Sequence, residues 1–264
     1  MEVTVLASGS GGNATLFESR GTRVLVDGGL GPRALARELS AIGVELPHAI
    51  VITHAHHDHV ANAPRLGKKL RVPIYMTDAT ARRAPMPSTV DVVRFHPRAA
   101  FGIGALTIAP TPLPHDAAQV ALSISDGACT ALLATDLGEV TGALLDVARA
   151  CDVLLLESNH DVTMLESGPY PSHLKQRIRG ARGHLSNDQA HALLRRLSHR
   201  TRTVVLMHLS QTNNSPRLAL ESARDALSGR AISLSVASPR QTMRIESHVV
   251  PRRGEQLAMA FGRN

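Results

Sequence analysis

Apolar and polar residues follow two different spacings along this chain, and the spacing predicts the secondary structure. Short runs rich in Val, Ile and Leu that end at Gly, Pro, Asn or Asp are typical of strands. Apolar residues three or four positions apart, such as Leu35, Leu39 and Ile42, are typical of a helix. We expect strands at residues 2–7, 13–18, 22–27, 49–53, 72–76, 91–95, 105–109, 119–125, 129–135, 152–156, 203–207, 231–236 and 241–246. We expect helices at residues 32–42, 140–150, 171–179, 187–198 and 216–227, and one that starts near His59 with Asp58 as its cap.

The length and composition of the chain favour a single domain. The 264 residues can bury one sizeable core, and we expect this domain to span residues 1–247, with a loosely held tail at 248–264. No stretch of about 20 apolar residues is present, so we expect no membrane span. Residues 1–6 lack the basic start of a signal peptide, and Cys129 and Cys151 lie in apolar runs without metal-ligand spacing. We therefore expect buried thiols and a cytoplasmic protein, which disfavours periplasmic antibiotic hydrolysis.

The charge of the chain favours a polyanionic partner. The formal net charge is +7 and the pI is about 10.4, although an Arg- and Ala-rich composition also makes many proteins basic. The basic residues Lys175, Arg177, Arg179 and Arg182 lie just before His184. Aromatic residues are scarce, which disfavours recognition by base stacking. We expect any contact with nucleic acid to depend on phosphates and shape.

The run Thr-His-Ala-His-His-Asp-His at residues 53–59 contains the most informative chemistry, because it follows the apolar run 49–52 directly. Histidine is a common metal ligand, and aspartate adds a hard oxygen. His54 and His56 can project to the same side while Asp58 and His59 turn toward a neighbouring position. This spacing suits two adjacent metal ions better than one. His57 is expected to be solvated or to contact the site from outside.

Three more candidate ligands stand directly after other apolar, strand-like runs: His115, Asp136 and His208. A strand that ends in a possible ligand therefore occurs four times. This repeat predicts a sheet edge that gathers metal ligands from distant parts of the sequence.

In their order along the chain, these positions resemble the five motifs of the metallo-β-lactamase superfamily. Asp27 resembles the first motif, a buried acid that orients the histidine loop, and residues 53–59 resemble the second. The other three motifs are matched by His115, Asp136 and His208. The resemblance covers nearly the whole chain. It implies an α/β fold of the αββα type, with two mixed β-sheets flanked by helices and with ligands at one sheet edge.

The same resemblance implies a site for two divalent cations. It assigns the first cation to His54, His56 and His115, and the second to Asp58, His59 and His208, with Asp136 bridging both. Two cations lower the pKa of a shared water, so that a hydroxide can attack the substrate, and Asp58 counts with the catalytic residues for this reason. Zinc and manganese both fit a mixed imidazole and carboxylate site. The sequence does not choose between them.

Residues 156–161, 168–171 and 183–187, together with residues 8–13, closely resemble the bacterial YycJ/WalJ (VicX) group. That group is regarded as metal-dependent DNA exonucleases that act in the 5′→3′ direction. Residues 183–187 are also similar to the Gly-His-Ser-Thr motif of tRNA 3′-processing ribonuclease Z, where a histidine held by a glutamate donates a proton. Glu157 and His184 match that pair. Hydrolysis of a phosphodiester expels a sugar alkoxide, which is a poor leaving group unless it is protonated. A protonated histidine can supply that proton.

Several residues are candidates for holding a substrate phosphate. Residues 186 and 187 open a helix whose free N–H groups can bind an anion, and the glycine-rich loop 8–13 can form a backbone nest. We expect one of these pockets to receive a terminal phosphate and to impose dependence on a strand end. His160 fits a structural role equally well. The candidates are Ser8, Ser10, Asn13, His160, Lys175, Ser186 and Asn187.

Other functions remain open at this point. The interval between Asp136 and His208 is too short for a separate β-CASP domain, and no long Gly/Pro-rich arm like that of ribonuclease Z is present. Both observations weaken RNA processing. A phosphodiesterase for small cyclic or nucleotide substrates is the second enzymatic reading. A thioesterase-like hydrolase has little need for Glu157 and His184, and a noncatalytic regulatory binding module has little need for a dimetal site.

Overall fold

The computed structural model describes residues 1–239 and 241–246, so the tail expected at 248–264 lies outside the described residues. The strands are β1 Glu2–Ala7, β2 Ala14–Ser19, β3 Thr22–Val26, β4 Ala49–Val51, β5 Ile74–Met76, β6 Val92–Arg94, β7 Phe101–Ile103, β8 Leu106–Leu113, β9 Gln119–Ser125, β10 Thr130–Ala134, β11 Val153–Glu157, β12 Thr203–Met207, β13 Ser233–Val236 and β14 Met243–Glu246. The helices are α1 Pro32–Ala41, α2 His57–Val60, α3 Ala63–Leu70, α4 Asp78–Arg83, α5 Gly142–Arg149, α6 Val162–Ser167, α7 Ser172–Arg179, α8 Asn187–Leu194 and α9 Pro216–Ala226.

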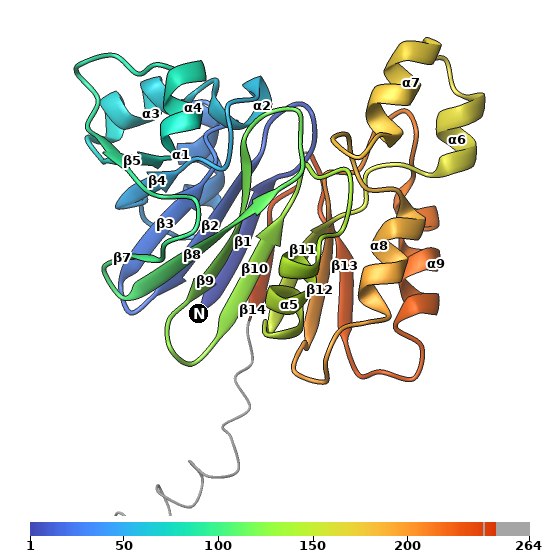
Figure 1. Cartoon of the computed structure of the whole chain (residues 1–264). Coiled ribbons are helices and arrows are strands. Elements are labelled where there is room, and N and C mark those ends of the chain that lie inside the picture. The colour runs from blue at the N-terminus through green and yellow to red at the C-terminus, as the bar shows by residue number, and fades with distance from the viewer. Residues whose placement is uncertain (240, 247–264) are drawn as a thin grey trace, which may run out of the picture.

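The strands form two sheets that face each other, with helices on both outer sides (Figure 1). The first sheet has the order β14-β1-β2-β3-β4-β5-β6, and the second has the order β13-β12-β11-β10-β9-β8-β7. Each sheet contains antiparallel pairs, such as β1 with β2 and β9 with β10. Each also contains parallel pairs, such as β3 with β4 and β10 with β11. The predicted αββα fold with two mixed sheets is confirmed.

Three apolar clusters hold these four layers together. Val5 and Phe17 of the first sheet and Leu155 of the second belong to the cluster between the sheets. Leu35 and other residues of α1 and α3 pack against the outer face of the first sheet, and α5, α8 and α9 cover the second. Strand β11 is buried along its whole length, which is why its sequence is a continuous apolar run instead of an alternating one. Each buried large apolar side chain contributes roughly 1.5–3 kcal/mol to the free energy of unfolding.

Several elements differ from the sequence prediction. Strand β7 and helices α4 and α6 were not expected. Strand β7 has three residues, and α4 and α6 have six each, which is too short for a clear apolar spacing. Strand β8 continues to Leu113 although it contains Pro110 and Pro112. This is possible because β7 pairs only with residues 106–108, so both prolines lie where β8 has β9 on one side and no ladder on the other.

The histidine-loop helix also begins earlier than predicted. Helix α2 starts at His57 with His56 as its N-cap, so Asp58 lies inside the first turn and does not cap the helix. Farther along, Ser186 caps α8 as expected and forms a capping box with Gln189. Within the part of the chain that the structure describes, no helix combines the length and the apolar character needed to cross a bilayer. Cys129 and Cys151 are buried thiols, and burial raises the pKa of Cys151 to about 12.

Candidate metal centre

The candidate ligands meet at the carboxyl ends of strands from both sheets. The first sheet contributes the residues after β3 and β4, and the second contributes the end of β11 and the residues after β8, β10 and β12. Because these ends face the same edge of the sandwich, residues far apart in sequence come within bonding range. They are Asp27, His54, His56, Asp58, His59, His115, Asp136, Glu157 and His208.

The backbone is strained at three of these strand ends. Asp27, Asp136 and His208 have φ values of 66°, 58° and 55°, in the left-handed region that side chains with a Cβ rarely adopt. Such conformations persist where the surrounding contacts fix them, and they gather at functional sites. Each of these turns directs a side chain across the sheet edge toward the others.

The first group of possible ligands consists of His54, His56 and His115, whose ligand atoms lie within 4.8 Å of one another. His56 Nδ1 lies 3.2 Å from His115 Nε2, so two ring nitrogens face each other. The outer nitrogen of His115 lies 3.0 Å from the Gly183 carbonyl, and that of His56 lies 3.0 Å from Asp116 Oδ1. Within the described part of the chain, the buried Nε2 of His54 has no hydrogen-bond partner. A buried nitrogen without a partner, beside two converging imidazoles, fits a metal ligand.

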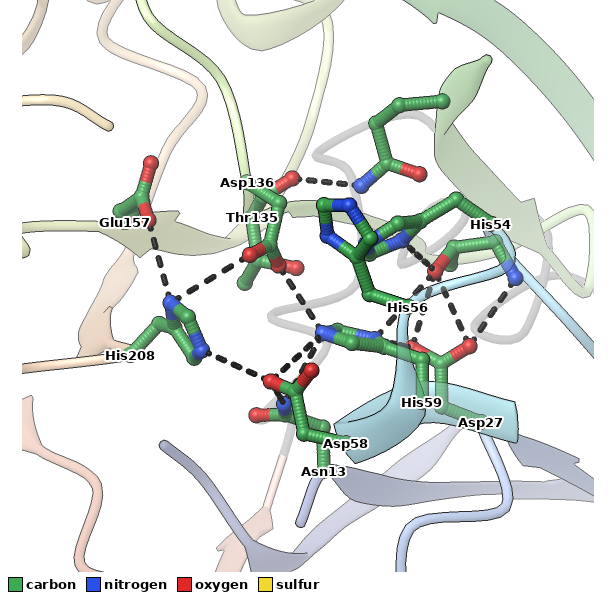
Figure 2. A network of polar contacts seen from close by, with 12 residues as sticks. Asn13, Asp27, His54, His56, Asp58, His59, Thr135, Asp136, Glu157 and His208 are labelled. Atoms are coloured by element: carbon green, nitrogen blue, oxygen red, sulfur yellow. Dashed lines mark hydrogen bonds and ion pairs between the residues drawn. The ribbon is translucent and has the colours of Figure 1, made fainter. Parts of the chain in front are cut away.

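The second group consists of Asp58, His59, Asp136 and His208, which also lie within 4.8 Å of one another (Figure 2). His59 Nε2 is 3.1 Å from Asp136 Oδ2 and 3.4 Å from Asp58 Oδ2. His208 Nε2 is 3.3 Å from the same Asp58 oxygen. These two groups contain the same residues as the two cation sites that the sequence resemblance implies. His57 is exposed and belongs to neither group.

Asp27 contacts the first and last residues of the histidine loop, Thr53 and His59. Its Oδ2 lies 2.7 Å from His59 Nδ1, and its Oδ1 accepts hydrogen bonds of 2.9 Å from the Thr53 N–H and hydroxyl. This leaves the other nitrogen of His59 directed at Asp58 and Asp136, as Figure 2 shows. Asp27 therefore contacts His59 directly, and its orienting role stays a prediction.

The chain reverses tightly beside Asp27, and this brings the first loop against the ligands. A Cβ on Gly29 would collide with the backbone of Asn13 and Asp58. The Asn13 side chain donates to Asp58 Oδ2 at 3.0 Å and lies 2.9 Å from His59 Nε2. Asn13 therefore contacts two possible ligands from inside the protein.

The charges around the second group favour cations. Burial opposes the protonation of His59, yet Asp27 and Asp136 raise its pKa well above the usual value. Burial likewise opposes the protonation of His208, but Asp136 and Asp58 raise its pKa to about 10. Burial would raise the pKa of Asp136, and these histidines instead hold it well below its usual value. A negative field that keeps protons on two buried imidazoles also attracts divalent cations, which would replace those protons.

In the first group, the pKa values of two histidines shift in the opposite direction. Burial lowers the pKa of His54 well below its usual value and also lowers the pKa of His115. Imidazole must be neutral to bind a metal, so the lowered pKa values of His54 and His115 favour the form that can bind a cation. Together the two donor sets, one of three histidines and one of two aspartates and two histidines, would fit two divalent cations.

A glutamate and a histidine adjoin this centre. Glu157 is fully buried, and its Oε2 accepts the N–H groups of Leu137 and Leu185, each at 3.1 Å. Its Oε1 lies 2.7 Å from His184 Nδ1 and 3.2 Å from His208 Nδ1. Burial would raise the pKa of Glu157, but His184 lowers it to about 2, and the carboxylate in turn raises the pKa of His184. One ionised carboxylate therefore contacts both a possible ligand and a possible proton donor.

His184 lines a cleft of about 190 Å³ next to the first group. Tyr170, Leu174 and Ile178 from the α6–α7 segment form one wall, and Ser10, Asn159 and Ser210 contribute polar groups. Sequence reasoning missed most of these residues, because none belongs to a motif with metal-ligand spacing. Asp116 and Arg177 also line the cleft and are joined by hydrogen bonds of 2.6 and 2.9 Å. Their only sequence signals were adjacency to His115 and membership of the basic run.

Most of the expected phosphate-binding residues have partners inside the fold. The Ser8 hydroxyl accepts the His208 N–H at 2.8 Å, and Asn187 is buried against Ser158 and Asn214. The Ser186 hydroxyl caps α8. Ser10, by contrast, lines the cleft.

His160 and Lys175 also have surroundings that the sequence did not indicate. His160 is buried, which lowers its pKa to about 4, and its Nδ1 has no hydrogen-bond partner among the described residues. Lys175 Nζ donates to the Glu166 carbonyl at 2.7 Å. Neither residue lines the cleft beside His184.

Comparisons with known proteins show which family the chain resembles. A family model described as a beta-lactamase superfamily domain matches residues 22–209. Exodeoxyribonuclease WalJ of Streptococcus pneumoniae is 35% identical over 82% of this chain and 84% of its own length. Exodeoxyribonuclease YycJ of Bacillus anthracis is 28% identical over 93% of this chain and 98% of its own.

A solved structure extends the comparison to the fold. The metallo-beta-lactamase fold protein YhfI from Bacillus subtilis superposes with a TM-score of 0.72 at 20% identity, covering 92% of this chain and 99% of that chain. The family model spans most of the chain, and WalJ matches along most of both sequences. The chain therefore belongs to the metallo-β-lactamase superfamily of metal-dependent hydrolases, in the group that contains WalJ and YycJ.

Proposed function

We propose that this protein is a dimetal-dependent DNA exonuclease that removes nucleotides in the 5′→3′ direction. The observation that carries the proposal is the contact between His184 and Glu157, 2.7 Å long and directly beside the two ligand groups. Two relatives named exodeoxyribonucleases support the choice of DNA as the substrate. The cytoplasmic location expected from the sequence is part of the same proposal.

The residues of the chain divide the chemical work. His54, His56, His115, Asp58, His59, His208 and Asp136 would hold two cations, zinc or manganese. When bound, these cations supply Lewis acidity that activates water and neutralises charge on the scissile phosphate. Asp27 orients His59, and Asn13 holds Asp58 from inside the protein.

His184 acts as the proton donor. The hydrogen bond to Glu157 places one proton on Nδ1, so Nε2 is the ring nitrogen that a substrate in the cleft can reach. A proton delivered from Nε2 converts the departing sugar alkoxide into an alcohol, which removes the main obstacle to breaking the phosphodiester. Glu157 is fixed by two backbone N–H groups, and it can stabilise the protonated ring without moving.

The experiment compares His184→Ala with the wild type on two substrates, using purified protein loaded with manganese or zinc. On end-labelled DNA the variant should be about 10²- to 10⁴-fold slower, because a general acid typically contributes that factor. On bis(p-nitrophenyl) phosphate it should stay close to the wild type, since p-nitrophenolate leaves without a proton. His199→Ala is the control, because His199 is exposed and follows the end of α8 that lies away from the site.

Undiminished DNA degradation by a metal-loaded His184→Ala protein would refute the proton-donor role. The position of the label tests the direction, because 5′→3′ digestion releases a 5′ label first. Turnover of small cyclic diesters far above that of DNA, with little dependence on salt, would instead favour the small-substrate phosphodiesterase. RNA is included as a parallel substrate.

A further inference from the structure

Most of the cations that the sequence places beside His184 are already bound to other groups of the protein. Arg177 pairs with Asp116, and Arg179 lies 3.6 Å from Glu166. Lys175 donates to the Glu166 carbonyl. This basic run therefore has less charge available for a polyanion than its sequence indicates.

A different group of cations surrounds a surface hollow of about 760 Å³ between α1 and α3. Its charged residues are Arg33 at the start of α1 and Arg65, Lys68 and Lys69 on α3, which we call the α1–α3 basic pocket. All four side chains are exposed, and no acidic residue lines the hollow. Over residues 1–239 and 241–246, none of the four forms an ion pair or a side-chain hydrogen bond.

The backbone adds donors to the same hollow. Helix α1 begins at Pro32 after Gly31, and no side chain caps it. The first N–H groups of a helix have no partner inside the helix and direct partial positive charge outward. Pro32 has no N–H, so at this helix the N–H groups concerned are those of Arg33 and Ala34, two residues that line the hollow together with the basic side chains of α3. Side chains and backbone thus present the same sign of charge.

The α1–α3 basic pocket is connected to the metal centre through a short rigid loop. The Gly28 N–H donates to the His59 carbonyl at 2.6 Å, and Asn62 donates to the Gly29 carbonyl at 2.9 Å. Gly31, in the pocket lining, is two residues from Gly29, a span of at most about 7 Å. Phosphates on one DNA strand recur about every 3.4 Å along the helix axis, so the span from Gly29 to Gly31 corresponds to about two phosphates.

The α1–α3 basic pocket belongs to helices that pack on the first sheet, whereas His184 contacts Glu157 at the end of β11 in the second sheet. Figure 1 shows α1 and α3 beside the first sheet and α7 beside the second, with α2 between them. The cleft beside His184 is small, about 190 Å³, which suits the end of a strand and not its whole length. The rest of a bound DNA strand must therefore extend from the metal centre over another surface. The α1–α3 basic pocket is such a surface, and its positive side chains have no acidic partner among the described residues.

We propose that the α1–α3 basic pocket binds the sugar-phosphate backbone of the DNA strand that remains after each cleavage. This inference rests on the proposed function and adds a second contact region to it. The contacts are to phosphates, so they hold any sequence and supply affinity without base selectivity.

The test measures how DNA affinity depends on salt for wild type and for the double variant Lys68→Ala/Lys69→Ala. A 3′-labelled 30-mer with phosphorothioate linkages is titrated with metal-loaded protein at several salt concentrations, and binding is followed by fluorescence anisotropy. Each lost phosphate contact reduces the slope of log K against log salt by about 0.9 for duplex and about 0.7 for single strands. Loss of two contacts should therefore flatten the slope by about 1.8 or about 1.4.

The control is Arg195→Ala/Arg196→Ala, which removes the same charge from exposed side chains at the far end of α8. Its slope should equal that of the wild type. Turnover of bis(p-nitrophenyl) phosphate should be unchanged in both double variants, because neither alters the metal centre. Equal slopes in the wild type and Lys68→Ala/Lys69→Ala, or equal flattening in both double variants, would overturn the inference.

These outcomes are distinct from failure of the proposed function. If metal-loaded wild type released no nucleotide from DNA, the exonuclease assignment would fail whatever the slopes. If wild type digested DNA and the Lys68→Ala/Lys69→Ala slope did not change, only the α1–α3 basic pocket would lose its role.

Discussion

The Asp27→Asn substitution tests the link between a buried carboxylate and metal binding. Asp27 Oδ1 accepts the Thr53 N–H, so the carbonyl oxygen of asparagine must keep that position. The new amide nitrogen then faces His59 Nδ1, where a carboxylate oxygen now lies at 2.7 Å. Two donors cannot share that contact, and His59 must move its proton to Nε2. This is the nitrogen that faces Asp58 and Asp136.

A protonated Nε2 cannot bind a cation, so the substitution should weaken one metal site. Removing the group that orients a ligating histidine typically costs 10- to 100-fold in metal affinity, or about 1.4–2.7 kcal/mol. The assay is a competition titration of metal-stripped protein against a chromogenic chelator, with stoichiometry from elemental analysis. One of two cations should bind more weakly, whereas the cation at His54, His56 and His115 should bind as in the wild type.

A second buried aspartate provides the control for a general loss of stability. Asp126 accepts the N–H groups of Ala128 and Cys129 in the turn before β10, at the end of that strand opposite Asp136. Asp126→Asn should lower the free energy of unfolding and leave both metal affinities intact. Wild-type affinity for both cations in Asp27→Asn would refute the orienting role, and so would an equal weakening in both variants.

Two further predictions follow from carboxylates outside the ligand set. Asp116→Ala removes the acceptor from His56 and the partner of Arg177, so metal affinity measured by the same titration should fall about 10-fold; unchanged affinity would show that Asp116 does not position the ligand. Burial would raise the pKa of Asp126, but the Cys129 N–H and the Ser19 hydroxyl hold it well below its usual value. Its contribution to stability is therefore present above about pH 4 and is lost as the pH falls toward the folded pKa. Asp126→Asn should flatten the fall in unfolding free energy below pH 4, and a parallel pH profile would contradict this.

Local sequence predicted the fold and the gathering of ligands because both depend on strand ends. A buried strand must be apolar, and its first polar residue marks the sheet edge, so the residues after β4, β8, β10 and β12 were visible as candidates. The resemblance to a known family then supplied the order of the motifs. The comparisons confirm that membership. The αββα layering is confirmed by the two sheets and their outer helices.

The contacts around the ligands could not be predicted in the same way. Ser8 and Asn13 are polar residues in a glycine-rich loop, a pattern that indicates an anion nest as readily as an internal brace. Only the path of the chain shows that Ser8 meets the His208 backbone and that Asn13 meets Asp58. Likewise, Lys175 and Arg177 lie within ten residues of His184 in the sequence, but their side chains contact Glu166 and Asp116.

The distribution of charge shows why the net charge alone does not locate the basic side chains that have no acidic partner. The buried centre needs carboxylates to attract cations, and those carboxylates are satisfied by histidines inside the protein. A basic side chain near that centre, such as Arg177, forms an ion pair with the exposed Asp116 and is then less available to a ligand from solvent. Unpaired cations must therefore lie where acids are absent, as on the walls of the α1–α3 basic pocket. Separation of the two regions keeps the carboxylates of the metal centre away from the α1–α3 basic pocket, so the acids that attract divalent cations do not neutralise the side chains that we propose to bind the remaining DNA strand.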